Sequence, residues 1–166
     1  MMSFANLILL TTALTTALIA GLFYAYFCSV NPGLSRLPDT EYLASMQAIN
    51  LAIVNPVFLL SFLGPLLLLP LSTYLQFQIS VSTRFWLLLA ATILYYAGGF
   101  GVTVFGNIPL NDALAGLDLG AATPELVARE RVKFENPWNR LHNLRTLACI
   151  VSFLLVIVAC LEKGKQ

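Results

Sequence analysis

The residues best suited to chemistry stand together at the start of the last apolar segment of the chain. The stretch WNRLHNLRT, Trp138–Thr146, holds the only histidine and runs directly into LACIVSFLLVIVACL, which has no charged residue. At about 100° per residue, His142 and Arg145 fall on one face of a helix. Histidine moves protons near neutral pH and arginine binds anionic oxygens. We therefore predict that both side chains face the interior of the protein.

Other interpretations of this stretch stay open at this point. Tryptophan and arginine at the start of a membrane helix are often interfacial anchors, and we assign that role to Arg140, which points away from His142. For Trp138, the sequence is compatible with an anchor and with a pocket residue. Arg145 lies about two turns inside the segment, where an unpaired charge is costly. A place in a polar pocket explains Arg145 better than an anchor does.

The cysteines give little support for a metal site. With one histidine in the chain, the usual three-histidine or histidine-carboxylate sites cannot form. A copper or zinc site made of Cys28, Cys149 and His142 is conceivable, because chain topology puts the three at similar depth. The sequence has no C-x-x-C pair, which disfavours a thiol oxidoreductase. We predict no metal and no other cofactor.

Composition predicts an integral membrane protein. Of the 166 residues, 58% are apolar and 10% charged, whereas soluble domains carry roughly a quarter charged residues. The net charge of +1 gives no reason to expect a nucleic-acid partner. In lipid, segments that cross about 30 Å of hydrocarbon must satisfy their own backbone as helices. We predict an all-α four-helix bundle in the lipid bilayer, one transmembrane domain over residues 1–166, with helices near residues 4–30, 47–74, 85–105 and 138–161.

Proline and charge patterns refine the connections. Asn31–Gly33 predicts a turn after the first helix. The third connection, residues 106–137, is the longest and holds most of the charge. Within it, Thr123 as the N-cap and Pro124 at the first helical position predict a short amphipathic surface helix over residues 124–134. Three prolines, which remove backbone donors, are expected to kink or break the second helix: Pro56, Pro65 and Pro70.

Chain topology brings the polar ends of the helices together. With four crossings, the end of the first helix, the start of the second, the end of the third and the start of the fourth share one membrane face. We predict a polar pocket between the helices there. Its expected ligand-binding residues are Asn50, Asn107, Asn111, Trp138, Asn139 and Thr146. The opposite end offers few polar groups, so we expect close packing there.

Charge counting and the pocket favour opposite orientations in the membrane. The terminal side carries Arg84, Lys163 and Lys165, and the other side carries more arginine and lysine, so the positive-inside rule favours cytoplasmic loops. However, the third connection is long enough to fold as a cap, and the site can hold Arg140 and Arg145. We therefore predict cytoplasmic termini and a pocket that opens outward.

Four motifs give the chain a resemblance to a known family. In chain order they are GLFYAYFCSVNPGL, MQAINLAIVNPVF, NIPLNDAL and WNRLHNLRT. The chain resembles the DUF1772 family of small four-helix membrane proteins, which includes the anthrone oxygenases of polyketide pathways. The family's polar positions match the pocket residues named above, together with Pro109, His142 and Arg145. Asn31 departs from the pattern, because the family often has an apolar residue there.

The resemblance implies an oxidoreductase, a monooxygenase that works without a cofactor on an anthrone-like aromatic substrate. His142 would be the base that removes a proton from an activated carbon, and Arg145 would stabilise the resulting enolate oxygen. Asn107, Asn111 and Asn139 would donate to other substrate oxygens. A pocket in the membrane suits a flat, hydrophobic small molecule.

A protein without catalytic activity is the alternative. The same pocket would then bind a lipid, a quinone or a small amphiphile, or the bundle would be a structural partner of another membrane protein. A transporter would require several copies of so small a bundle, that is, a homo-oligomer. The sequence leaves the oligomeric state open.

Overall fold

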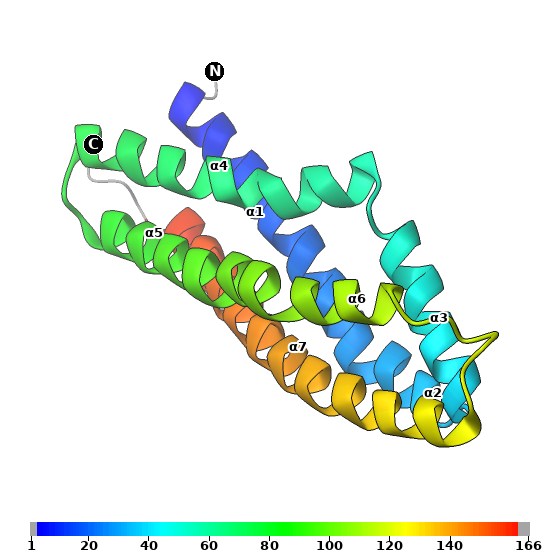
Figure 1. The fold of residues 1–166 in the computed structure, drawn as a ribbon. Coiled ribbons are helices and arrows are strands. Elements are labelled where there is room, and N and C mark those ends of the chain that lie inside the picture. Colours follow the sequence, from blue (N-terminus) through cyan, green and yellow to red (C-terminus); the bar gives the residue numbers. More distant parts are fainter. Residues whose placement is uncertain (1–2, 163–166) are drawn as a thin grey trace.

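The protein is a bundle of long helices (Figure 1). The computed structural model describes residues 3–162, so Lys163 and Lys165, on which the predicted orientation partly rests, lie outside the described residues. Residues 3–162 contain no strand. Four helical spans are long and apolar enough to cross a membrane: Phe4–Leu34, Pro56–Ile79, Thr83–Ala115 and Pro124–Leu161. The prediction of an all-α, four-helix, multi-pass membrane protein is confirmed.

The first span continues through the residues predicted to form a turn. It consists of α1 (Phe4–Ala25), the π-helical segment η1 (Tyr26–Val30) and α2 (Asn31–Leu34), so the turn predicted at Asn31–Gly33 is wrong. A proline cannot donate to the carbonyl four residues before it. The wider hydrogen-bonded ring of η1 lets the helix pass Pro32 without a break.

The segment predicted as a second helix is two helices. α3 (Asp39–Ala52) is separate from α4 (Pro56–Ile79), so the predicted start of the second span at residue 47 is wrong. The residue before a proline disfavours helical geometry, and Asn55 is extended. Its side chain caps α4 by accepting a hydrogen bond from the Phe58 N–H, at 3.0 Å. The two later prolines lie inside α4 without breaking it: Pro65 and Pro70.

The third span extends beyond its predicted end at residue 105. It consists of α5 (Thr83–Leu94), the π-helical segments η2 (Tyr95–Gly101) and η3 (Thr103–Asn107), and α6 (Ile108–Ala115). η3 precedes Pro109 as η1 precedes Pro32, so the same widening of the helix carries the chain past the proline. Gly98 allows α7 to approach, because a Cβ atom there would collide with the Ala148 Cβ.

The last span, α7 (Pro124–Leu161), is one continuous helix. The separate surface helix predicted for residues 124–134 is part of α7, and the third connection shrinks from residues 106–137 to residues 116–123. Pro137 lies inside α7 but does not end it. The helix continues because an apolar stripe on both sides of the proline packs against α3. This stripe consists of Val127, Phe134 and Trp138.

Two buried clusters divide the molecule. The first, the membrane core, lies between α1, α4, α5 and α7 and includes Ile19 and Leu69. The second, the cap core, includes Tyr42, Met46 and Phe134. α7 reaches both clusters, because its 38 residues measure about 57 Å and the hydrocarbon measures about 30 Å. The cap is made of α2, α3, α6 and the start of α7, and it lies at the end of the bundle remote from both termini (Figure 1).

Candidate active site

A cavity of about 450 Å³ lies at the boundary between the membrane core and the cap. Its walls come from α1, α3, α4, α6 and α7, with Tyr26 of η1 and Thr103 of η3. Ligand pockets measure roughly 300–1,000 Å³, so the cavity is large enough for a small molecule. Most of its wall is apolar. The predicted site residues that line it are Asn50, Asn111, Trp138, His142 and Arg145.

His142 is completely buried, and both of its ring nitrogens have partners. Nδ1 accepts hydrogen bonds from Nε and Nη2 of Arg145, at 3.2 and 3.1 Å. A ring nitrogen that accepts from a guanidinium carries no proton. The imidazole proton is therefore on Nε2, which donates to the Phe23 carbonyl oxygen 3.1 Å away. These hydrogen bonds define a neutral imidazole whose lone pair is directed at Arg145.

Arg145 is a buried cation without a carboxylate partner among residues 3–162. A guanidinium has five N–H groups; two of them donate to His142, and one Nη1–H donates to the Thr103 hydroxyl at 3.3 Å. Two N–H groups remain without an acceptor in the described residues. The guanidinium carbon lies 4.4 Å from the centre of the Phe23 ring and 5.2 Å from that of Trp138. These cation–π contacts stabilise the charge, and an anionic ligand would stabilise it further.

Trp138 fixes the position of the imidazole. Its ring is stacked on His142, with ring centres 5.0 Å apart and planes 7° from parallel. The indole N–H donates to Oδ1 of Asn111 in α6, at 2.8 Å. Trp138 is 3% exposed, so it is a wall of the cavity and not an interfacial anchor. Arg140 is exposed on the opposite side of α7.

Three predicted residues lie beside the site but do not line the cavity: Asn107, Asn139 and Thr146. Thr146 donates to the His142 carbonyl at 2.7 Å, and its hydroxyl is also 3.3 Å from Nε2. Asn107 donates to the Trp138 carbonyl at 3.2 Å. Oδ1 of Asn139 is buried and has no partner among the described residues. The structure gives Thr146 and Asn107 a role in holding the site, and their contact with a substrate stays a prediction.

Thr103 and Asp112 line the cavity but were not among the predicted site residues. A sequence signal existed for Asp112, because Ile108, Asn111, Asp112 and Ala115 recur on one helical face, and all four line the cavity. Asp112 is exposed. Thr103 had no such signal, since its role depends on the π-helical path of η3.

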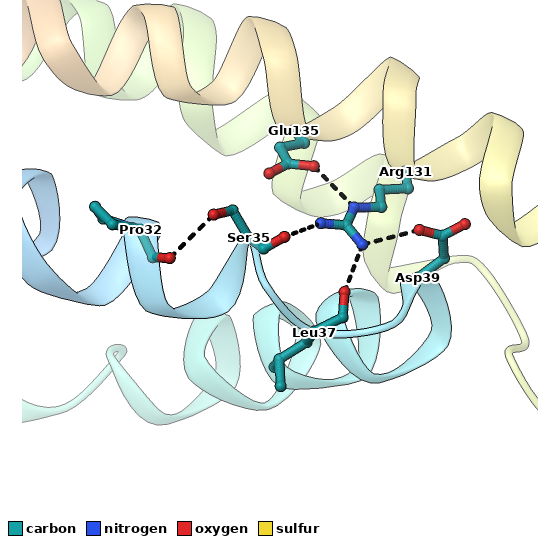
Figure 2. Close-up of polar contacts among 6 residues, drawn as sticks. All are labelled: Pro32, Ser35, Leu37, Asp39, Arg131 and Glu135. Atoms are coloured by element: carbon teal, nitrogen blue, oxygen red, sulfur yellow. Dashed lines mark hydrogen bonds and ion pairs between the residues drawn. The ribbon is translucent and has the colours of Figure 1, made fainter.

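The α3 wall of the cavity is fastened to α7 by Arg131 (Figure 2). The Arg131 side chain is 13% exposed and bonds to four acceptors. They are the carbonyl oxygens of Ser35 (2.8 Å) and Leu37 (2.7 Å) and the carboxylates of Asp39 (2.8 Å) and Glu135 (2.8 Å). These two carbonyl groups lie just after α2, where the chain has no further helical N–H groups to donate to them. One guanidinium therefore fixes the loop that leads into α3.

Two further side chains hold α3 in place. Tyr42 is buried beneath Arg131, 4.5 Å from ring centre to guanidinium carbon; burial and the nearby Glu135 carboxylate raise the pKa of its phenol, against the opposing effect of Arg131. Gln47 donates from Nε2 to two carbonyl oxygens at the end of α6, both at 2.9 Å. Asn50 follows one turn later and lines the cavity. Its Nδ2 is buried without an acceptor among residues 3–162, so a donor is left for a ligand.

The three cysteines lie in different surroundings. Cys28 and Cys160 are exposed, and Cys149 is buried, where its sulfur lies against Gly99. Within residues 3–162, no three His, Cys, Asp or Glu side chains are close enough to share a metal ion.

Comparison with known proteins identifies a family. The family model described as anthrone oxygenase matches residues 53–155, which is more than half of the chain. The match includes four of the predicted cavity residues: Asn111, Trp138, His142 and Arg145. No curated protein and no solved structure matches the chain.

Proposed function

The chain belongs to the anthrone oxygenase family, and from this premise we propose that it is a membrane-embedded, cofactor-independent monooxygenase for a hydrophobic, anthrone-like substrate. One observation carries the proposal: Arg145, a buried cation without a carboxylate, contacts a neutral His142 in the wall of a largely apolar cavity. Such a pair suits a reaction in which a neutral substrate loses a proton and becomes an anion.

The cavity favours a flat substrate that carries oxygen atoms. Phe58 and Phe62 line it and are stacked on each other, 5.4 Å between ring centres and 10° from parallel, so an aromatic substrate packs against aromatic rings. The substrate carbonyl oxygen accepts from the two uncommitted N–H groups of Arg145. The free Nδ2 donor of Asn50 is available to a second oxygen.

Arg145 and His142 act in sequence on the substrate. Two N–H groups of Arg145 now donate to Nδ1 of His142, and a substrate oxygen that accepts from the two uncommitted N–H groups draws the guanidinium away from Nδ1. As the guanidinium turns to the substrate, the Nδ1 lone pair becomes free to accept a proton from the activated CH₂ group. The negative charge moves to the substrate oxygen, where Arg145 stabilises it.

Dioxygen then oxidises the carbanion. The enolate carbon bonds to one oxygen atom and forms a peroxide, which takes up the proton held by His142. Loss of the second C–H proton breaks the O–O bond, leaves a carbonyl group on the carbon and releases hydroxide, which is protonated to water. The balance is CH₂ plus O₂ giving C=O plus H₂O, with dioxygen as the only oxidant.

We also propose that the termini are cytoplasmic, although plain charge counting favours the reverse. Arg131 is bonded to four acceptors within the cap and Arg145 lies in the cavity, so neither is a free anchoring charge. Proteolysis of sealed, oriented vesicles tests the orientation. Residues 116–123 should be cleaved only when the protease reaches the side of the membrane opposite the cytoplasm, and this result supports cytoplasmic termini. Cleavage by protease on the cytoplasmic side contradicts cytoplasmic termini.

The oxygenase is tested by replacing His142. In lipid nanodiscs, we expect the protein to convert anthrone to anthraquinone with one O₂ consumed per substrate, followed by absorbance and an oxygen electrode. His142→Ala should lower the rate by roughly 100-fold or more, measured above autoxidation in empty nanodiscs. Asn143→Ala, an exposed neighbour on α7, is the matched control.

Two results would contradict this proposal. Undiminished turnover by the His142→Ala variant would show that His142 is not the base. A wild-type protein that holds anthrone in native mass spectrometry but does not turn it over is a binding protein, which is the non-catalytic alternative.

A further inference from the structure

The cavity has an apolar mouth and a polar interior. Among its lining residues, Leu51 and Val54 are 78% and 70% exposed and Ile108 is 41% exposed. Leu51 lies near the end of α3, Val54 in the α3–α4 junction and Ile108 at the start of α6. By contrast, His142 is fully buried and Arg145 is 8% exposed. A ligand that enters beside these three side chains therefore passes hydrocarbon before it reaches His142 and Arg145.

Helix lengths place this mouth at the edge of the membrane. α4 begins at Pro56, directly after the junction, and its 24 residues measure about 36 Å, slightly more than the hydrocarbon thickness of about 30 Å. Residues three positions from Val54 and Ile108 in the chain are also apolar and exposed: Val57 is 76% and Phe105 84% exposed. Large exposed apolar side chains are unfavourable in water, and lipid acyl chains cover them at no such cost.

The packing of the helices leaves this side of the cavity to the lipid. α4 packs against α1, α5 and η2, whereas α6 packs against α3, η3 and α7. The cavity lies where these two groups separate, since it is lined by both α4 and α6. Asp112 is the one carboxylate in the lining, and it is exposed. A carboxylate is costly in hydrocarbon, which places the outer edge of the mouth at the level of the lipid head groups.

We propose that the ligand enters the cavity sideways from the bilayer, through a portal bordered by Val54 and Ile108. The substrate is therefore a molecule that dissolves in the membrane before it binds, and its polar atoms reach Arg145 last. The identity of this substrate rests on the proposed function, but the portal itself requires no turnover.

Fluorescence of Trp138 reports on entry through the portal. Trp138 lines the cavity and is 3% exposed, and Trp86, which is 59% exposed, is removed by Trp86→Phe. The probe is anthraquinone joined by an alkyl chain to a phospholipid, so that it cannot leave the bilayer; its quinone quenches tryptophan on contact. Vesicles that contain the probe are fused with vesicles that contain the protein, and quenching is followed in time.

We expect quenching in the Trp86→Phe protein and a roughly tenfold slower rate when Val54→Phe and Ile108→Phe narrow the mouth. Val57→Phe is the matched control, because Val57 is similarly exposed but does not line the cavity; its rate should stay within about twofold. Free anthraquinone should finally quench the narrowed variant as fully as the parent, which shows that its cavity is intact.

The portal is overturned if the narrowed variant is quenched at the parental rate, or if only water-soluble anthraquinone sulfonate quenches. The oxygen-uptake assay tests the proposed oxygenase activity separately from the portal. Quenching by the tethered probe without turnover contradicts the oxygenase activity and supports the portal. Turnover without such quenching contradicts the portal and supports the oxygenase activity.

Discussion

The membrane core and the cap are both packed with apolar side chains, but different kinds of hydrogen bond join their helices. In the membrane core, hydroxyl groups join the helices: Thr12 to Ser72 at 2.8 Å and Thr73 to Thr92 at 3.0 Å. In the cap, the charged Arg131 bonds to two carboxylates and two carbonyl groups. Charged side chains cost little free energy where water and head groups surround the protein, whereas in lipid neutral hydroxyl groups cost less than charges do. The solvent of each region therefore selects its polar chemistry.

Arg145 follows neither pattern. It is a charge on the membrane side of the boundary and has no carboxylate among the described residues. A buried charge without a counter-ion is costly, and packing alone does not require one. This exception to the contrast between core and cap makes the cavity the candidate functional site.

The largest expected effect comes from Arg145→Met, which removes the buried charge that has no carboxylate partner. We expect kcat for anthrone oxidation to fall about 10²–10³-fold, the usual cost of losing a donor to an oxyanion, while the melting temperature changes little, because removal of a buried charge without a carboxylate partner offsets the loss of the donors to Nδ1 of His142. Turnover and differential scanning fluorimetry in nanodiscs measure both. Arg140→Met, on the exposed side of α7, is the control and should change neither. A large loss of stability in Arg145→Met would make the residue structural.

The next effect separates the cap from the membrane core. Arg131→Ala should lower the stability of the cap by about 2–3 kcal/mol, since it removes hydrogen bonds to charged groups. Hydrogen exchange of the α3 amides, Asp39–Ala52, should accelerate accordingly, and exchange in α4 and α5 should not. Arg129→Ala is the control, because Arg129 is 65% exposed and surface ion pairs contribute little. Equal effects of the two variants would refute the fastening role of Arg131.

A smaller effect is expected at the boundary between the regions. Trp138→Phe and Asn111→Ala each break the 2.8 Å hydrogen bond between them, and each should cost about 1 kcal/mol. Because both remove the same bond, the double variant should cost less than the sum. A thermodynamic cycle from chemical denaturation measures this, and strict additivity would show that the bond does not couple α6 to α7.

The smallest effect is expected in the membrane core. Ser72→Ala removes the hydroxyl pair with Thr12 and should cost about 0.6 kcal/mol, the average for such bonds in membrane proteins. Turnover should be unaffected. Unfolding in mixed detergent micelles measures the change. A cost as large as that of Arg131→Ala would remove the contrast between the two regions.

Topology and helix phase predicted much of the candidate site from the sequence. Both depend only on the number of crossings and on 3.6 residues per turn, and these bring Asn50, Asn111, His142 and Arg145 to one cavity. The same reasoning could not tell that Asn107 and Asn139 lie beside the cavity. Asn107 lies at the end of η3, where the π-helical turn changes the helix phase. Asn139 lies on α7, and its rotation depends on how α7 packs against its neighbours.

The cap could not be predicted, because its contacts join distant parts of the chain. Arg131 pairs with Glu135, four residues further along the same helix, which is a local contact that helical spacing allows. Its other acceptors, Ser35, Leu37 and Asp39, lie more than ninety residues away in the sequence. These long-range bonds and the packing on α3 outweigh the helix-breaking tendency of Pro137, so α7 continues where proline patterns favour two helices.

Pro137 is the position at which α7, the longest helix, bends most easily. Without an amide proton, Pro137 cannot donate to the carbonyl of Lys133, four residues earlier in α7. Bending therefore costs least one residue before Trp138, where the cap meets the membrane core. Because α3 and α6 of the cap also form walls of the cavity, a bend at Pro137 would change the distance between those walls and the imidazole and guanidinium on α7.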